Sequence, residues 1–427
     1  MSKPSANKFL SGKSALSIIA AALMLAGVAT GTLLLPTGSA AMGISMIMAG
    51  LGLGCFLLAI ASRSQLLIPL LALNLLVFFN IGATLFLAPN VPELSHLGGF
   101  RFFSIETMVN NLGHTVLSGN LYNVFQRTTE LAVLAMGMTL VTSASKGQDI
   151  SVGAAAAIAG SVFVRIILAN EFTLIYMILA VLASCLVAML FGAFNGTLVA
   201  VFRIQPMVAT LILFTTGRAI AYWINGGATP TVNNNQWLDS FSRFIPGVPI
   251  HTPIITAIAC GIIIVLALKY TNLGLYTQSV GINEKAAHLN GISPLKVKLL
   301  AFMILGICVA VAAVTSVGRI GLINHQTILK GIEMDAILAV AIGGNALSGG
   351  KFRMAGSVIG AYVIQGLTET LYTMMVSSTD IQAYKAVVII LLVVMSSPVV
   401  KEKLNRLRGN RRAVREQTLF EEGELHE

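Results

Sequence analysis

KYTNLGLYTQSVGINEKAAHLNGISPLKVK, residues 269–298, separates two long apolar runs, residues 253–268 and 299–318. The stretch carries four lysines, and loops of membrane proteins that are rich in lysine and arginine stay in the cytoplasm. Residues 283–289 predict a short helix, because Asn283 is a good N-cap, Gly291 a good C-terminal stop, and Pro294 follows. Two interpretations stay open at this point: a surface helix that joins two spans, or a docking helix for a soluble partner.

The composition excludes a water-soluble globular protein. Of 427 residues, 56% are hydrophobic and only 10% are charged, whereas soluble domains carry about 25% charged residues. The mean hydropathy is +0.84. The formal net charge is +10, but the basic residues lie beside apolar runs and form no solvated domain with interleaved aromatics, so no nucleic-acid partner is expected. The sequence predicts a polytopic membrane protein.

The cysteines and histidines indicate no metal site. Cys55, Cys185, Cys260 and Cys308 stand singly in apolar runs, with no CxxC spacing, which is typical of small core residues. None of the six histidines pairs with another at a metal-ligand spacing. We expect neither a metal nor a cofactor on this chain.

An all-α fold with about twelve membrane spans is predicted, because a bilayer core about 30 Å thick needs roughly 20 apolar residues per helix. The expected spans are residues 15–35, 41–61, 66–88, 124–145, 152–169, 173–201, 204–225, 251–268, 298–318, 335–350, 354–376 and 383–400. Basic residues concentrate in the alternate connections that include 269–298. The distribution predicts both termini in the cytoplasm.

Three domains are expected from these spans. Residues 1–65 hold a polar start and two helices, the first of which is too long for a signal peptide. Residues 66–400 form the main membrane domain, in which the outer connection 89–123 holds an amphipathic helix around residues 104–117. Residues 401–427 are first basic and then acidic, and predict a cytoplasmic tail.

Two polar, glycine-containing stretches interrupt the apolar pattern. One includes Gly147, Asp149 and Ser151; the other runs over residues 343–350 and contains Gly343, Gly344, Gly349 and Gly350. Backbone that is not helical at membrane depth must be buried in protein or line a polar cavity. Both stretches are therefore candidates for hinges in discontinuous helices. The pairs Gly50/Gly54, Gly192/Gly196 and Gly356/Gly360 predict close contacts between helices.

Polar side chains inside spans indicate function by default, because they are costly in lipid. The set comprises Asn195, Gln205, Arg218, Asn225, Asp335, Gln365 and Glu369. Uncharged amides and hydroxyls suit a neutral hydroxylated solute. For the substrate pathway we expect Asn195, Gln205, Thr210 and Asn345.

Four stretches together resemble one family, the permease subunits of bacterial ABC importers for ribose, xylose, galactofuranose and related monosaccharides. The stretches are ELAVLAMGMTLVTSASKGQDISVGAAAAIAG (130–160), FNGTLVAVFRIQPMVATLILFTTGRAIAYWINGG (194–227), TNLGLYTQSVGINEKAAHLNGISPLKVKLLAF (271–302) and MDAILAVAIGGNALSGGKFRMAGSVIGAYVIQG (334–366). The order is that of the family. The resemblance implies a core of about ten helices, preceded here by two additional ones.

The resemblance also implies partners: a second permease subunit, a cytoplasmic ABC ATPase that binds ATP and magnesium, and a soluble sugar-binding protein outside. The family's coupling helix carries a Glu-x-Ala-Ala-x-x-x-Gly pattern, which stands here as Glu284, Lys285, Ala286, Ala287 and, after three residues, Gly291. Where the family reads GGIDLSVG, this chain has Lys146 in place of a glycine and Gln148 in place of an isoleucine.

The expected function is that of an inner-membrane permease for a monosaccharide, with ATP hydrolysis on another chain. The sequence shows no Walker motif and no nucleophile triad. Alternatives are a secondary transporter driven by an ion gradient, an ABC permease for nucleosides, and a membrane-embedded enzyme or scaffold.

Overall fold

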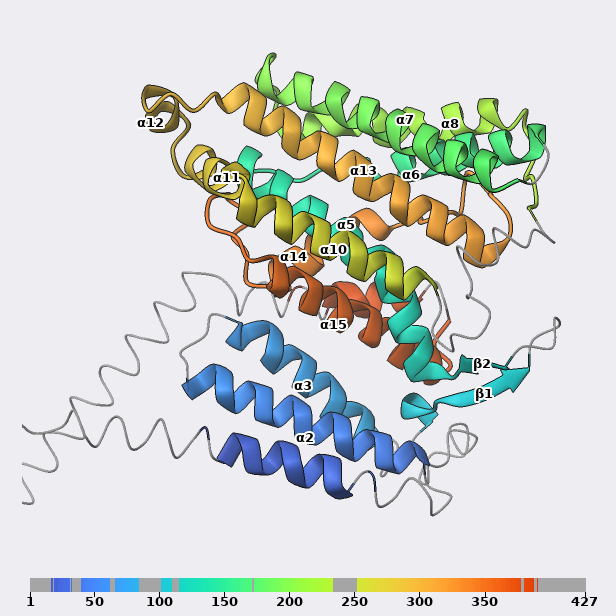
Figure 1. Cartoon of the computed structure of the whole chain (residues 1–427), viewed down its shortest axis with the longest axis vertical. Helices are drawn as coiled ribbons and strands as arrows, with labels where there is room; N and C mark the ends of the chain where they lie inside the picture. The colour runs from blue at the N-terminus through green and yellow to red at the C-terminus, as the bar shows by residue number, and fades with distance from the viewer. Residues whose placement is uncertain are drawn as a thin grey trace, which may run out of the picture. The chain divides into compact units, whose positions relative to one another are not determined.

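A computed structural model describes residues 17, 19–30, 32, 40–61, 66–83, 101–109, 115–170, 173–232, 252–377, 380–387 and 390. These residues are helical apart from one short hairpin and the connecting turns (Figure 1). After a helical segment Ile19–Thr30, the elements are α2 (Ala40–Ala61), α3 (Leu67–Gly82), η4 (Arg101–Phe103), β1 (Glu106–Val109), β2 (Thr115–Ser118), α5 (Asn120–Ser145), α6 (Val152–Ala169), α7 (Leu174–Ala200), α8 (Pro206–Ile224), α10 (Thr252–Tyr270), α11 (Leu273–Ile282), α12 (Glu284–Leu289), α13 (Pro294–Ile320), α14 (Ile332–Ile342) and α15 (Met354–Thr373).

Five helices of the described residues are long and apolar enough to cross a membrane, namely α6, α7, α8, α10 and α13. Helix α5 has 26 residues, which at 1.5 Å per residue is about 39 Å and also exceeds the bilayer core. The fold is therefore that of a helical, multi-pass membrane protein. The first and last expected spans, residues 15–35 and 383–400, lie partly outside the described residues.

The span expected over residues 335–350 is broken at its glycine-rich stretch, where a discontinuous helix was predicted. Helix α14 has only 11 residues and ends at Ile342. Gly344 has a φ of +79°, a conformation that glycine adopts readily and that no α-helix contains. Hydropathy counts the apolar residues of this stretch but does not detect the backbone reversal, so it overestimated the length of the helix.

The amphipathic helix expected around residues 104–117 is also wrong. Residues Glu106–Val109 and Thr115–Ser118 form the antiparallel strands β1 and β2, in which Thr107 pairs with Leu117 and Val109 with Thr115. Four of these eight positions are threonine or valine, residues that favour extended backbone. Over so short a stretch, apolar periodicity does not separate helix from strand.

Helices α5, α6 and α13 form the buried centre of the molecule. Nearly every residue of α5 from Thr128 to Ala144 is buried, and α6 and α13 are buried over most of their length. Helices α7, α8 and α10 instead bury less than a third of their residues, as lipid-facing or subunit-facing helices do. In Figure 1, α12 lies at one end of these helices and the β-hairpin lies at the opposite end.

The three glycine pairs make the close helix contacts that were predicted. A Cβ added at Gly192 would collide with Phe302 O of α13, and one at Gly360 with Ala339 O of α14. Gly50 approaches Gly27 so closely that the added Cβ would lie 2.6 Å from Gly27 Cα. Such approaches let backbones pack without intervening side chains.

The helices before the hairpin pack against one another and against the core. Asn74 of α3 donates to Gly52 O of α2 (3.1 Å), and Asn80 of α3 donates to the Thr370 hydroxyl of α15 (2.8 Å). The described residues up to Val376 belong to one compact unit, and the few described residues from Ser377 onward belong to a second. Of the second unit the structure describes residues 377, 380–387 and 390, which include the helical stretch 380–387.

Candidate functional site

Helix α12 is the short helix that the sequence predicted between the two apolar runs. The Asn283 side chain accepts a hydrogen bond from the Ala286 N–H (3.1 Å) and so caps the helix at its N-terminus. Gly291 has a φ of +80° and reverses the chain, and Pro294 occupies the first turn of α13. Because both ends of α12 are fixed by local interactions, its formation follows from the sequence alone.

The side chains of α12 divide into an inner and an outer set. Ala287 is only 4% exposed and packs inside the chain, whereas Leu289 is 87% exposed. Ala286 and Ile282, which precedes the N-cap, are also exposed. Glu284 forms an ion pair with Lys298 of α13 (2.7 Å). The exposed apolar surface of α12 therefore comes from Leu289 and Ala286, extended by Ile282 at the end of α11. Ala287 fixes the helix to its own protein.

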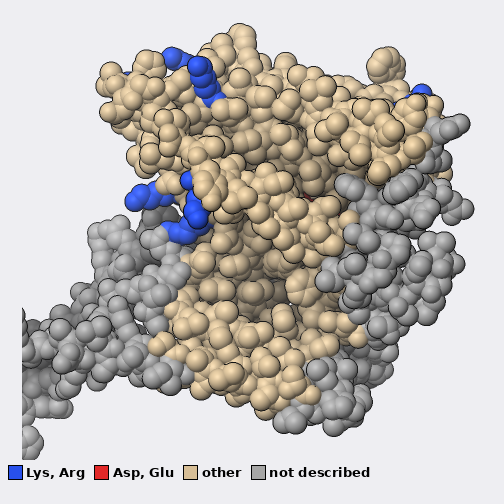
Figure 2. Space-filling view, viewed as in Figure 1, with Lys and Arg blue, Asp and Glu red and all other residues tan. Residues whose placement is uncertain are grey.

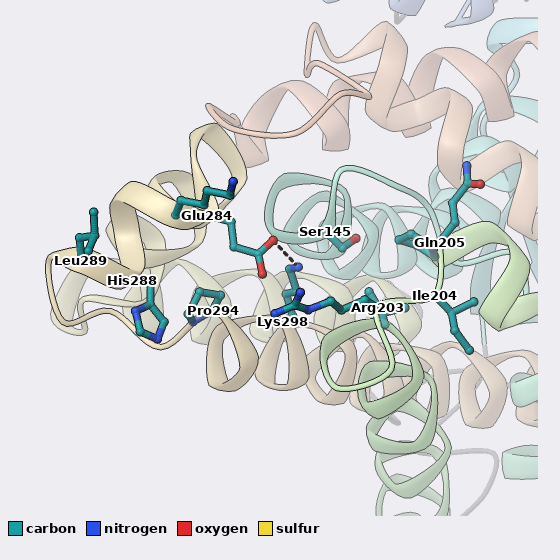
Figure 3. Close-up of a pocket in the computed structure, with 12 residues that line it drawn as sticks. Ser145, Arg203, Ile204, Gln205, Glu284, His288, Leu289, Pro294 and Lys298 are labelled. Atoms are coloured by element: carbon teal, nitrogen blue, oxygen red, sulfur yellow. Dashed lines mark hydrogen bonds and ion pairs between the residues drawn. The ribbon is translucent and has the colours of Figure 1, made fainter.

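A cleft of about 730 Å³ opens beside α12 (Figure 3). Its lining comes from the ends of α5, α7, α8, α12 and α13, and includes Ser145, Arg203, Gln205, Lys285, His288 and Lys298. Gln205, one of the expected pathway residues, is exposed here. The basic side chains outnumber Glu284, the one acidic residue of the lining, so the cleft favours a neutral or acidic occupant.

The chain between α5 and α6, residues 146–151, is the first break. Lys146 adopts a left-handed conformation (φ +58°) and ends α5. The chain then turns back along α5, because the Asp149 N–H lies 3.5 Å from Met138 Sδ. Asp149 Oδ1 accepts from both the N–H (2.7 Å) and the hydroxyl (2.6 Å) of Ser151. The carboxylate thereby satisfies the polar backbone that leads into α6.

Two expected pathway residues belong to this first break. The Asn195 amide of α7 donates to Ser151 Oγ (2.9 Å) and Asp149 Oδ2 (3.3 Å). The Thr210 hydroxyl of α8 accepts from the Ile150 N–H (3.2 Å). Asn195 and Thr210 are both fully buried, so in this structure they support the backbone of the break.

The second break covers residues 343–353, between α14 and α15. Gly344, Gly349 and Gly350 have positive φ. The Asn345 side chain donates to Ser357 Oγ (2.7 Å) and accepts from the Arg353 N–H (2.6 Å), and Ser357 in turn bonds Thr139 of α5 (2.6 Å). Asn345, the fourth expected pathway residue, is thus buried, and its side chain joins the start of the second break to its end at Arg353.

The two breaks contact each other. The Gly350 N–H donates to Ser143 O (3.1 Å), and the Ser143 hydroxyl donates to Gly350 O. The Gln148 amide donates to Leu347 O (3.4 Å). Gly147, whose added Cβ would lie 2.7 Å from Pro206 Cγ, joins the first break to the start of α8. The predicted hinge residues therefore form one polar assembly.

Sequence reasoning missed a third irregular segment, residues 321–331, between α13 and α14. Arg218 of α8 holds it by donating to His325 O (2.8 Å) and Ile328 O (3.2 Å). Glu333, next to this segment, points at the start of α6, where a Cβ on Gly153 would lie 2.5 Å from its Oε2. Glycines at positions 321 and 331 flank the polar residues 324–327, a pattern from which an irregular segment could have been predicted.

Ion pairs near the hairpin end of the helices were also missed. Glu130 of α5 pairs with Arg319 of α13 (3.0 Å) and Glu369 of α15 lies 3.9 Å from Arg127 of α5. Glu130 and Glu369 are buried, and such charges persist in a membrane protein when they are paired. Within the described residues, no group of three or more His, Cys, Asp and Glu side chains is placed to hold a metal ion.

Comparison with known proteins gives the family. Residues 120–397 match the family described as "Branched-chain amino acid transport system / permease component". The galactofuranose transporter permease protein YtfT of Escherichia coli (strain K12) is 37% identical over 284 residues, which are 66% of this chain and 80% of the relative. The fructose import permease protein FruF of Bifidobacterium longum (strain NCC 2705) is 35% identical over 298 residues, 69% of this chain and 81% of the relative.

The ribose import permease protein RbsC of Escherichia coli (strain K12) is 34% identical over 281 residues, 65% of this chain and 85% of the relative. No solved structure matches this chain. The matched residues include both breaks, α12 and the helices that surround them, and the relatives confirm the resemblance drawn from the four sequence stretches. The chain belongs to the permease-component family of the branched-chain amino acid transport system type.

Proposed function

We propose that this chain is the membrane-spanning permease subunit of an ATP-driven importer for a monosaccharide. The observation that carries the proposal is α12, a capped helix with an exposed apolar surface at one end of a helical membrane protein. Three permeases at 34–37% identity are named for galactofuranose, fructose and ribose, which supports a sugar as the solute, although the family's own description names branched-chain amino acids.

In this proposal the end that carries α12 faces the cytoplasm. Lys269 lies at the end of α10, Lys285 in α12, and Lys296 and Lys298 at the start of α13. Most Lys and Arg side chains visible in Figure 2 gather near this end. Cytoplasmic connections are enriched in such residues. The same rule supports both termini inside the cell, as an even number of about twelve spans requires. The helical segment Ile19–Thr30, α2 and α3 precede the family match, which begins at residue 120.

The partner at α12 is an ABC ATPase subunit. Leu289 and Ala286 supply an apolar contact surface, Lys285 and Glu284 supply charge at its edge, and Ala287 and Gly291 fix the helix in place. A short helix with both ends capped moves as one body. ATP and magnesium are held by that ATPase, and this chain supplies no catalytic group of its own.

The solute crosses between this chain and a second permease subunit, after delivery by a soluble sugar-binding protein. Asn195, Thr210 and Asn345 act on transport by holding the two breaks, because their polar groups point into the chain. Gln205, which lines the α12 cleft, acts on transport from there. Gly343 and Gly349 of the second break and Asp149 of the first supply the hinges.

Reconstitution in proteoliposomes tests the proposal. The chain is purified alone and with its co-purifying ATPase and binding protein, and uptake of labelled ribose, fructose and galactofuranose is measured with and without ATP. Uptake of one sugar that needs ATP and the ATPase supports the proposal. Uptake by the chain alone under a proton or sodium gradient would identify a secondary transporter, and selective uptake of nucleosides would replace the sugar.

A further inference from the structure

The end of α11 lies against the end of α5 and the second break with no side chain between the backbones. A Cβ added at Gly281 would collide with Ser143 O, and it would lie 2.6 Å from Gly350 N and 3.0 Å from Gly350 Cα. Ser143 and Gly350 are themselves joined by two hydrogen bonds. Three segments, the end of α5, the end of α11 and the second break, therefore meet at backbone contact distance, which only glycine at position 281 permits.

Lys146 adds a side-chain contact at the same place. Its Nζ donates to Ile282 O (3.4 Å), and Ile282 stands directly before Asn283, the N-cap of α12. The backbone of Lys146 is left-handed, a conformation in which glycine would be less strained. The related permeases' pattern has glycine here. This chain instead has a lysine, which strains the backbone but whose side chain reaches the residue before the α12 N-cap.

Gln148 makes the corresponding contact with the second break. Its amide donates to Leu347 O (3.4 Å), which the isoleucine of the related pattern has no group to do. At two of the three positions where residues 146–153 depart from GGIDLSVG, Lys146 and Gln148, the side chain hydrogen-bonds to another segment. Each of these two side chains ties the first break to a different neighbour.

We propose that Gly281, Lys146 and Gln148 are positioning residues that link α12 to both breaks as one rigid unit. This inference rests on the proposed function. Two residues separate Gly281 from the start of α12, so a displacement of α12 reaches Ser143 and Gly350 with no flexible loop to absorb it. An ATPase bound at α12 would therefore move both breaks together.

Gly281→Ala tests the contact, with Gly274→Ala as the matched control on the same helix. The atom nearest to a Cβ at Gly274 is Leu268 Cδ2 at 3.4 Å, an ordinary contact. The readout is solute imported per ATP hydrolysed by the purified complex in proteoliposomes. We expect Gly281→Ala to lower this ratio about tenfold, as overpacking at backbone distance displaces one segment, and Gly274→Ala to leave it unchanged.

Lys146→Gly separates coupling from folding. The substitution relieves the left-handed backbone and removes the link to Ile282, so the melting temperature of the complex is expected to stay level or rise while the import-to-hydrolysis ratio falls. A residue that served folding alone would move both in the same direction. Lys146→Arg, which keeps a donor on a long side chain, is expected to retain more of the ratio than Lys146→Met.

Each outcome separates the link from the proposed function. An unaltered complex that imports sugar with ATP, together with a Gly281→Ala complex of equal ratio, would overturn the link and leave the function standing. A failure of the unaltered complex to couple import to ATP would overturn both. A lowered ratio in Gly281→Ala and Lys146→Gly, with Gly274→Ala unchanged, supports the link.

Discussion

Replacing Asn345 by alanine tests whether one side chain closes the second break. The amide donates to Ser357 Oγ (2.7 Å) and its carbonyl accepts from the Arg353 N–H (2.6 Å). The same amide also donates to Val340 O and Arg353 O. Loss of these two bonds leaves neither carbonyl unpaired, because the Asn345 N–H still donates to Val340 O and the Ser357 N–H to Arg353 O. The substitution therefore removes two interactions that nothing else replaces.

The cost follows from those two interactions. A partly buried N–H left without an acceptor costs about 1–3 kcal/mol, and the lost bond to Ser357 adds about 1 kcal/mol. The sum is about 2–4 kcal/mol of stability. For a large helical domain this corresponds to a fall in the melting temperature of at least about 3 °C.

The assay is thermal unfolding of the purified chain in detergent, followed by intrinsic fluorescence. Asn272→Ala is the matched control, because Asn272 also stands at a helix end but its side chain caps nothing. We expect the control to melt within about 1 °C of the unaltered chain, as exposed substitutions usually do. Equal melting temperatures for the two variants would refute the assignment of Asn345 to the second break.

Three further predictions concern other parts of the molecule. Leu289→Asp is expected to abolish co-purification of the ATPase without lowering the melting temperature, since this side chain is 87% exposed; unchanged co-purification would exclude α12 as the docking surface. Glu130→Gln should destabilise the chain by about 3–5 kcal/mol because it leaves Arg319 without its buried partner. Its control, Glu284→Gln, changes an exposed pair and should cost less than about 1 kcal/mol. Similar melting curves for the two variants would contradict this prediction. Gly360→Leu should prevent folding, as judged by size-exclusion chromatography, because it adds three further carbon atoms beyond a Cβ that already collides with Ala339 O.

The features that the sequence predicted correctly depend on residues close together in the chain. Helix α12 follows from Asn283, Gly291 and Pro294, all within twelve positions. The bounds expected for α6 are the observed ones, because an apolar run starts directly after a polar break. Both breaks were placed by glycine and polar residues that lipid does not accommodate as irregular backbone.

The features that were wrong or missed depend on distant contacts. The roles of Asn195, Gln205, Thr210 and Asn345 in the substrate pathway stay predictions. What the sequence missed is their location: Asn195 and Thr210 lie at the first break, Asn345 at the second and Gln205 in the α12 cleft. Nothing local to Asn195 indicates that its partner is Asp149, 46 residues away. The ion pair of Glu130 with Arg319 spans 189 residues and was invisible for the same reason.

The bonds between the two breaks impose an order on the synthesis of this protein. Ser143 and Gly350 are 207 residues apart, so at about 5–20 residues per second the ribosome needs roughly 10–40 s to supply the second partner. The first break receives Asn195 and Thr210 much sooner. During the interval the Ser143 carbonyl and hydroxyl lack their Gly350 partners, so these groups depend on water or on the insertion machinery. A chain truncated before the second break would never supply those partners.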